Sequence, residues 1–179
     1  EFNKIKYTHS GVLSSALAMD KVASKKIFIK NDILTPKFIV AKNNLINLNT
    51  LKAKIRTKLN FPVVIKPVNE GSSVDVFICS EKNFKKNLTK LKKYKEILIE
   101  EYIGGREIQA AILGDKKLGV IELKPQRKFY DYKAKYNSNS KTEHIIPVSL
   151  SKKNYNKVMN ISLKVHKLLN CRGVTRSDF

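Results

Sequence analysis

The chain has 179 residues, of which 42% are hydrophobic, and a formal net charge of +21. It contains no run of about 18–20 apolar residues, which excludes a membrane-spanning helix of ordinary composition. Only two cysteines, Cys79 and Cys171, are present, which excludes a disulfide-stapled scaffold and favours a reducing, cytoplasmic compartment. The length is compatible with one large domain or two small ones.

The positive charge raises the question of nucleic-acid binding. Only five of the 36 basic residues are arginine, and the lysines are scattered among Asn and Ile along the whole chain. The planar guanidinium of Arg suits base edges and phosphates better than an ammonium group does. A genome biased toward Lys, Asn and Ile codons would give the same pattern, so we expect no nucleic-acid partner. The charge would still attract anionic substrates.

Hydrophobic spacing predicts alternating helices and strands in the first half of the chain. A helix is predicted to begin at Ser10 or Ser14 and to end near Met19, and a second helix follows. The further elements predicted here are helices over 20–30 and 45–59 and strands over 38–40, 62–66 and 74–79.

The second half is predicted to begin with a basic helix over 81–93, for which Ser80 can be the N-cap. A strand, a hairpin, a long loop, an amphipathic helix and a final strand should follow. These elements are predicted over 97–102, 106–113 with 118–124, 125–147, 155–170 and 173–179, respectively.

The clearest chemistry lies where the predicted strand over 62–66 ends in Lys66 and a Glu-Gly-Ser-Ser turn follows over 70–73. Backbone N–H groups and hydroxyls of such a turn can bind phosphate oxygens, while the lysine supplies a fixed charge. The spacing does not match a Walker loop. The alternative is an ordinary polar turn beside a lysine whose stem covers apolar surface, and the segment alone does not decide between the two.

Three further predicted strands carry charged residues near their ends. Glu100 and Glu101 could read an adenine edge and Glu107 could hold ribose hydroxyls, although a solvated acidic strand end is the simpler alternative. Arg176 and Asp178 are two positions apart on the last strand, which places both on one face. Together these groups suggest an anionic ligand with a metal ion.

Five motifs in this order and spacing resemble the D-alanine–D-alanine ligase family of the ATP-grasp superfamily, and they cover essentially the whole chain. They are Tyr7–Leu13, Ala16–Lys21, Lys66-Pro67 with Glu70–Val74, Glu100–Ile103 with Gly105–Glu107, and Phe129–Tyr136.

The resemblance implies an α+β, ATP-grasp fold in which two antiparallel-sheet subdomains sandwich ATP. Residues 1–9 would be the remnant of an N-terminal α/β domain, 10–99 the central subdomain and 100–179 the start of the C-terminal subdomain. The chain lacks an initiating Met, and we expect it to be a fragment that is inactive alone.

The implied reaction joins two D-alanine molecules for peptidoglycan precursor synthesis and uses ATP with Mg²⁺ or Mn²⁺. One D-alanine carboxylate attacks the γ-phosphate, and the amine of the second attacks the acyl phosphate. The resemblance is also compatible with a homodimer of the full-length enzyme. It implies no membrane association.

The resemblance assigns site residues by matching motif positions. Lys21 and Lys66 would hold ATP phosphates, Glu100, Glu101 and Ile103 the adenine, and Glu107 the ribose. Phe129 would pack against the nucleotide, and Lys135 would approach the γ-phosphate. Arg176 would stabilise the oxyanion, Asp178 would bind Mg²⁺, and Ser72 with Tyr136 would couple two loops over the substrate.

The chain departs from the family pattern at Asp75, where the family usually has Gly. We expect this side chain to point outward, because it alternates with Val74 and Val76 on the predicted strand. His9, His144 and His166 have no metal spacing; we expect His144 in the loop and His166 on a helix surface. The alternative functions are another ATP-grasp carboxylate–amine ligase and a non-catalytic basic nucleotide- or nucleic-acid-binding module.

Overall fold

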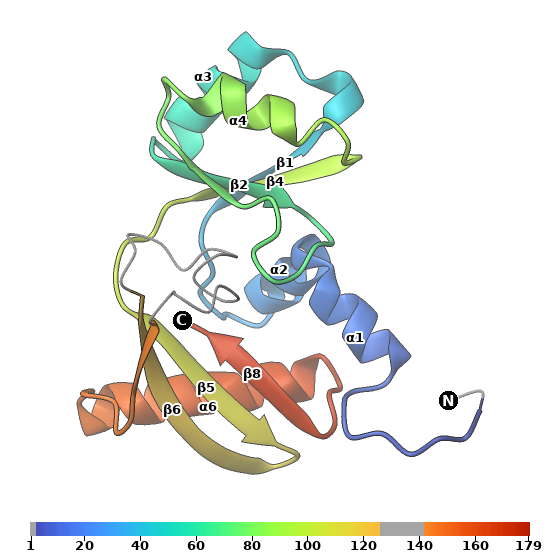
Figure 1. Cartoon of the computed structure of the whole chain (residues 1–179), viewed down its shortest axis with the longest axis vertical. Coiled ribbons are helices and arrows are strands. Elements are labelled where there is room, and N and C mark those ends of the chain that lie inside the picture. Colours follow the sequence, from blue (N-terminus) through green and yellow to red (C-terminus); the bar gives the residue numbers. More distant parts are fainter. Residues whose placement is uncertain (1–2, 126–141) are drawn as a thin grey trace. The chain divides into compact units, whose positions relative to one another are not determined.

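The structure is a computed structural model that describes residues 3–125 and 142–179. The chain divides into two compact units. Within the described residues, one unit comprises 3–18, 105–125 and 142–179, and the other comprises 19–104 (Figure 1). Each unit has its own antiparallel four-stranded sheet, so the predicted α+β class is confirmed.

In the unit formed by 19–104, the sheet has the strand order β1-β4-β2-β3. Helices α3 and α4 cover one face of this sheet, and α2 lies on the other (Figure 1). The elements are α2 (Lys21–Lys30), β1 (Phe38–Lys42), a 3-10 turn η1 (Asn43–Leu45), α3 (Leu48–Lys58), β2 (Val63–Pro67), β3 (Phe77–Cys79), α4 (Phe84–Lys90) and β4 (Glu96–Glu101).

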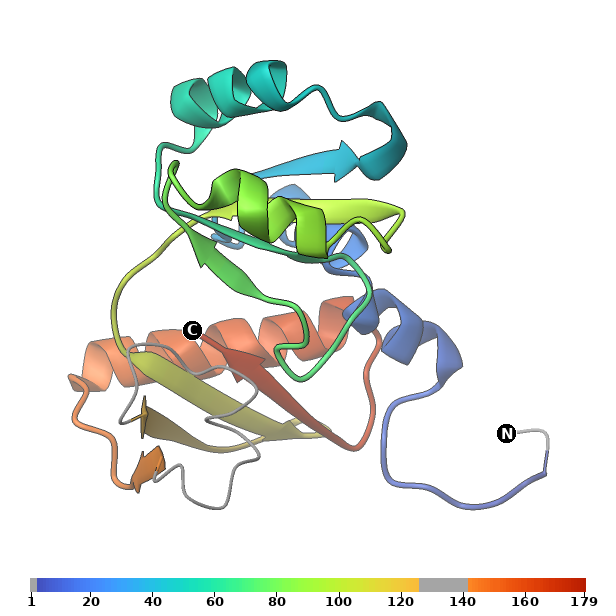
Figure 2. The same cartoon turned by 45° about the horizontal axis from the view of Figure 1, so that its top comes forward.

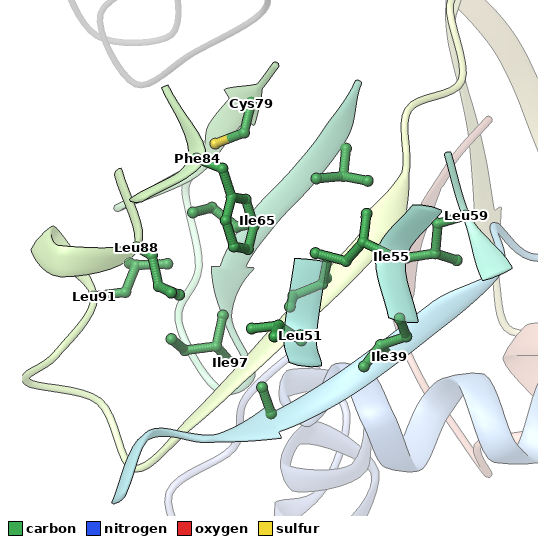
Figure 3. Close-up of a cluster of buried hydrophobic side chains, with 13 residues drawn as sticks. Ile39, Leu51, Ile55, Leu59, Ile65, Cys79, Phe84, Leu88, Leu91 and Ile97 are labelled. Atoms are coloured by element: carbon green, nitrogen blue, oxygen red, sulfur yellow. The ribbon is translucent and has the colours of Figure 1, made fainter. Parts of the chain in front are cut away.

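Alternation along the strands sends one set of apolar side chains into a single core. Ile39 pairs with Ile99 across β1 and β4, and Ile65 pairs with Ile99 across β2 and β4. These residues pack against Ile55 of α3 and Phe84 of α4, both of which are fully buried (Figure 3). Because the strand period is two, the neighbours of these residues face the opposite side of the sheet.

Side-chain caps explain where two helices of this unit begin. Asp20 accepts hydrogen bonds at 2.9 Å from the backbone N–H groups of Val22 and Ala23, and Asn47 caps α3 in the same way. The predicted cap at Ser80 is wrong, because α4 begins at Phe84 after Asn83 and ends at Lys90. Helix α4 is therefore shorter than predicted.

In the other unit, the sheet has the strand order β7-β6-β5-β8, and α6 packs along it (Figure 2). Helix α6 begins three residues before the predicted start, because Ser151 caps its first turn. The elements are α1 (Val12–Met19), β5 (Glu107–Leu113), β6 (Lys116–Pro125), β7 (Thr142–Ile145), α6 (Lys152–Leu168) and β8 (Val174–Asp178). Among the helices of the described residues, none combines the length and the apolar composition that a membrane span requires.

Two histidine expectations are wrong. His144 lies in strand β7, which pairs with β6, rather than in a loop. His166 is buried rather than exposed on a helix surface, and its Nδ1 lies 2.7 Å from the Thr175 hydroxyl. Helix α6 is thereby linked to strand β8.

The segment before α1 and the first turn of α1 pack against the connection between α6 and β8. The hydroxyl of Ser10 donates to the carbonyl of Arg172 at 3.0 Å, and that of Ser14, in α1, donates to the carbonyl of Asn170 at 2.6 Å. Gly173 has φ +67°, and a Cβ there would lie 1.7 Å from the carbonyl oxygen of Thr8. Only glycine suits this position, since any side chain would meet both backbone strain and a clash.

Candidate functional site

A charged cluster lies on the face of the β1-β4-β2-β3 sheet that is opposite the apolar core. The register pairs Val64 with Glu100 and Lys66 with Leu98, so Lys66 and Glu100 share this face. Glu100 is only 5% exposed, yet its carboxylate forms an ion pair with the ammonium group of Lys66. Glu100 is therefore not part of the solvated acidic strand end considered from the sequence.

Lys25, on α2, is a second cation bound to the same carboxylate. Its Nζ lies 2.6 Å from Oε1 of Glu100 and also donates to the Thr35 hydroxyl at 2.7 Å and to the Pro36 carbonyl at 2.9 Å. Burial lowers the pKa of Lys25, and the neighbouring Glu100 carboxylate opposes this shift. The network satisfies the ammonium and carboxylate groups that burial removes from water.

Sequence reasoning missed Lys25. The available signal was its position four residues after Lys21, which places both lysines on one face of the same helix. Nothing in the spacing indicated a buried carboxylate partner. That partner comes from a strand that lies 75 positions later in the chain.

Lys21, at the start of α2, binds the beginning of the segment that joins β2 to β3. We call residues 68–76 the serine loop. The Nζ of Lys21 donates to the Val68 carbonyl at 3.1 Å and to the Glu70 carbonyl, and its backbone N–H also donates to Val68 at 3.2 Å. Burial lowers the pKa of Lys21, and the positive charge of Lys66 lowers it further.

The backbone of the serine loop is a tight turn rather than the predicted start of a strand. Ser72, Ser73 and Asp75 have φ values of 51°, 60° and 53°, and the N–H of Val74 donates to the Gly71 carbonyl at 3.0 Å. Strand β3 begins only at Phe77, because a left-handed backbone cannot extend a ladder.

Asp75 does not point outward as expected. Its Oδ2 accepts a hydrogen bond from the Tyr94 hydroxyl at 2.6 Å and lies 2.8 Å from Nζ of Lys93. The sequence-based reason for the outward orientation was alternation on a strand, and no strand forms at Val74–Val76. Asp75, which stands where the family usually has Gly, is therefore held by Tyr94 and Lys93.

The end of β4 offers polar backbone and an exposed apolar side chain. The carboxylate of Glu101 accepts from the Lys37 N–H at 2.7 Å, and the Glu101 N–H donates to the Lys37 carbonyl at 3.0 Å. Ile103 is 63% exposed, and Tyr102 before it is partly exposed. This segment follows directly from the strand that carries Glu100.

In the other unit, Arg176 and Asp178 lie on β8 opposite Ala111 and Gln109 of β5. The predicted shared face is confirmed, since Nε of Arg176 donates to Oδ1 of Asp178 at 3.0 Å. Both side chains are more than half exposed. Glu107 is the first residue of β5.

Divalent metals such as Mg²⁺ bind one or two carboxylates together with substrate phosphates. The exposed carboxylate of Asp178 suits one such ligand position. The described residues contain no group of three or more His, Cys, Asp or Glu side chains that could hold a metal without a substrate. Phe129, Lys135 and Tyr136 lie outside the described residues.

Comparisons with known proteins agree with one another. The model of the D-Ala–D-Ala ligase C-terminus matches residues 27–179. The D-alanine–D-alanine ligase of Pelagibacter ubique is 61% identical over all of this chain and 59% of its own length, and that of Wolbachia pipientis wMel is 40% identical over 98% and 54%. The chain thus spans between half and three-fifths of the length of these two curated relatives.

Solved structures match the fold as well. A D-alanine–D-alanine ligase from Bacillus anthracis superposes with a TM-score of 0.81 at 33% identity, over 99% of this chain and 57% of that one. The structure of this ligase complexed with ATP gives a TM-score of 0.76 at 29% identity, over 99% and 55%. Residues 27–179 thus match the C-terminal part of this family, and the chain belongs to the D-alanine–D-alanine ligase family and has an ATP-grasp fold.

Proposed function

We propose that this chain provides the ATP-binding part of an enzyme that joins two D-alanine molecules at the expense of ATP, for peptidoglycan precursor synthesis. The observation that supports this most directly is the placement of Lys21 and Lys66 beside the serine loop, with Glu100 between Lys66 and Lys25. Lys66 remains 22% exposed while its partner carboxylate is buried. Its cation can therefore reach a ligand without leaving Glu100 unpaired, because Lys25 remains.

The nucleotide roles that we propose rest on these contacts and on family membership. Lys21 and Lys66 hold phosphate oxygens, because fixed ammonium groups neutralise the charge that phosphoryl transfer concentrates. Glu100, Glu101 and Ile103 hold the adenine, and Glu107 holds the ribose. Phe129 packs against the nucleotide, and Lys135 approaches the γ-phosphate.

The proposed chemistry has two steps. The carboxylate of one D-alanine attacks the γ-phosphate, which releases ADP and forms an acyl phosphate. The amine of the second D-alanine then attacks the acyl carbon, expels phosphate and loses a proton. Arg176 stabilises the oxyanion of the second step, since a donor aimed at developing charge lowers the barrier. Ser72 and Tyr136 couple two loops over the substrate. Asp178 is a ligand for Mg²⁺ or Mn²⁺, which neutralises phosphate charge when bound.

Several properties of the whole protein are part of the same proposal. They are a cytoplasmic location, a homodimer of the full-length enzyme, and subdomains at about 10–99 and 100–179 after a remnant at 1–9. Another ATP-grasp carboxylate–amine ligase, with a different acceptor, is the alternative within this class.

The 179 residues alone are expected to make no dipeptide. Phosphate release by the purified chain that depends on D-alanine would contradict this expectation.

Isothermal titration of the purified chain with ATP, with and without magnesium, tests the nucleotide site. We expect saturable binding that strengthens with Mg²⁺ and weakens in Lys66→Ala. Lys54→Ala is the matched control, because Lys54 is an exposed lysine on α3 of the same unit. Equal binding by the two variants would contradict the role of Lys66, and no binding by the unaltered chain would contradict the proposed function.

The same titrations separate this function from a basic nucleic-acid module. Affinity for duplex DNA that rests on phosphate neutralisation falls steeply with salt. Mg-ATP in a defined site should instead depend on the magnesium concentration. Strong, salt-sensitive binding of DNA without any binding of Mg-ATP would favour the alternative.

A further inference from the structure

We propose that Asp75 is a positioning residue that fixes the far end of the serine loop, so that the loop is held at both of its ends. The inference rests on the proposed function insofar as the loop covers ATP phosphates. The carboxylate of Asp75 has two partners, the Tyr94 hydroxyl at 2.6 Å and Nζ of Lys93 at 2.8 Å.

Tyr94 is itself held in place by packing and by hydrogen bonds. Its side chain packs against the core formed by the sheet with α3 and α4. The amide nitrogen of Asn43 donates to the carbonyl of Tyr94 and, at 2.8 Å, to that of Leu91, which is fully buried. A hydrogen bond to Tyr94 therefore ties Asp75 to the core of the unit rather than to another surface loop.

The N-terminal end of the serine loop is held by a different residue. Lys21 binds the Val68 and Glu70 carbonyls from α2. Between Glu70 and Asp75 lies a short span that contains Ser72, the residue proposed to act over the substrate. Two anchors from different elements thus define where this span begins and ends.

The backbone conformation explains why anchoring is needed. Ser72, Ser73 and Asp75 all have positive φ, which costs free energy for residues other than glycine. Such a conformation persists where surrounding contacts determine it. The hydrogen bonds of Asp75 supply such contacts and stabilise its positive φ. A glycine at this position would adopt the same φ without them.

The partners of Asp75 also compensate its charge. A carboxylate near bound phosphates would repel them unless it were neutralised. The hydrogen bonds from Lys93 and Tyr94 lower the pKa of Asp75, so it stays ionised and paired. An aspartate in the serine loop is therefore compatible with an anionic ligand.

Hydrogen exchange and ATP titration on the purified chain test this proposal. Asp75→Asn removes the ion pair with Lys93, and Tyr94→Phe removes the hydroxyl. Each variant should raise the exchange rates of amides in residues 70–76 and the Kd for Mg-ATP by roughly fivefold. Lys93→Arg, which keeps the charge, should behave like the unaltered chain, whereas Lys93→Ala should resemble Asp75→Asn.

Glu81→Gln is the matched control, because it breaks an ion pair of similar exposure with Arg56 in the same unit. We expect it to leave residues 70–76 and the Kd unchanged. Unaltered exchange of residues 70–76 in both Asp75→Asn and Tyr94→Phe would overturn the anchor. Faster exchange of residues 70–76 with an unaltered Kd for Mg-ATP would also overturn the proposal, because anchoring the loop would then not contribute to ATP binding. If the unaltered chain binds no Mg-ATP, the proposed function fails, while the exchange rates still decide whether the anchor exists.

Discussion

The ammonium group of Lys25 lies 2.6 Å from the carboxylate of Glu100, and both side chains are 7% exposed. The same carboxylate also pairs with the more exposed Lys66. The buried Glu100 thus lies between Lys25, which is buried and has a structural role, and Lys66, which is exposed enough to reach a ligand. The residue type alone does not distinguish these two roles, because both residues are lysines; their different burial does.

Replacing Lys25 should destabilise the unit formed by 19–104. Removing one partner of a buried ion pair typically costs about 3–5 kcal/mol. We expect the loss of unfolding free energy in Lys25→Ala to lie near or below the lower end of that range, because Lys66 still pairs with Glu100. Lys26→Ala, at the exposed neighbouring position on α2, should change the free energy of unfolding by no more than about 0.5 kcal/mol. Denaturant unfolding measures both variants, and equal stability of the two would contradict the structural role of Lys25.

The buried His166 should make stability depend on pH near neutrality. Burial lowers the pKa of His166 from its ordinary value of 6.5. The unfolded chain therefore binds this proton at a higher pH than the folded chain does, so the free energy of unfolding should decrease as the pH falls below about 6.5. We expect His166→Gln to show a weaker decrease between about pH 7 and pH 5 than the unaltered chain.

His144→Gln is the control for this measurement, because His144 is exposed on β7. It should keep the pH dependence of the unaltered chain. If His166→Gln and His144→Gln have the same pH profile, His166 is not the group responsible.

Arg176 should matter to the rate rather than to ATP binding. The kinetic test uses a chimera in which this chain replaces the matching part of the Pelagibacter ubique relative, which is 61% identical. Loss of one oxyanion donor typically lowers kcat by about 10²-fold or more, so we expect that loss in Arg176→Ala, with little change in the Kd for ATP. An unaltered kcat in steady-state assays would contradict the assignment.

Asp178 should matter to magnesium. In the same chimera, Asp178→Asn should raise the magnesium concentration that gives half-maximal rate, because an amide is a weaker ligand than a carboxylate. Asp115→Asn is the control, since Asp115 is an exposed aspartate of the same unit that pairs only on the surface with Lys167. If the two variants have the same magnesium dependence, Asp178 is not a ligand.

Much of the fold was predictable because apolar spacing is a local signal. The ends of α2 and the hairpin of β5 and β6 lie close to their predicted positions. The errors occurred where local pattern competes with longer-range contacts. Val74–Val76 has the alternation of a strand, but the loop there turns and Asp75 bonds to Tyr94.

The site was predictable in part. The shared face of Arg176 and Asp178 follows from strand geometry alone and is confirmed. The position of Lys66 beside Glu100 depends on the register between β2 and β4, which spacing does not specify. Lys25 was missed for the same reason, because its partner Glu100 comes from a strand far along the chain.

Lys66 is proposed to bind an ATP phosphate in an ATP-dependent D-alanine–D-alanine ligase. The most direct test measures dipeptide formation by the chimera as a function of ATP concentration, for Lys66→Ala and Lys54→Ala. A charge-assisted contact is worth about 1.5–3 kcal/mol, so kcat/KM for ATP should fall by about tenfold or more in Lys66→Ala. It should be unchanged in Lys54→Ala. Equal values of kcat/KM for the two variants, in a chimera that makes the dipeptide, would show that Lys66 is not a phosphate ligand.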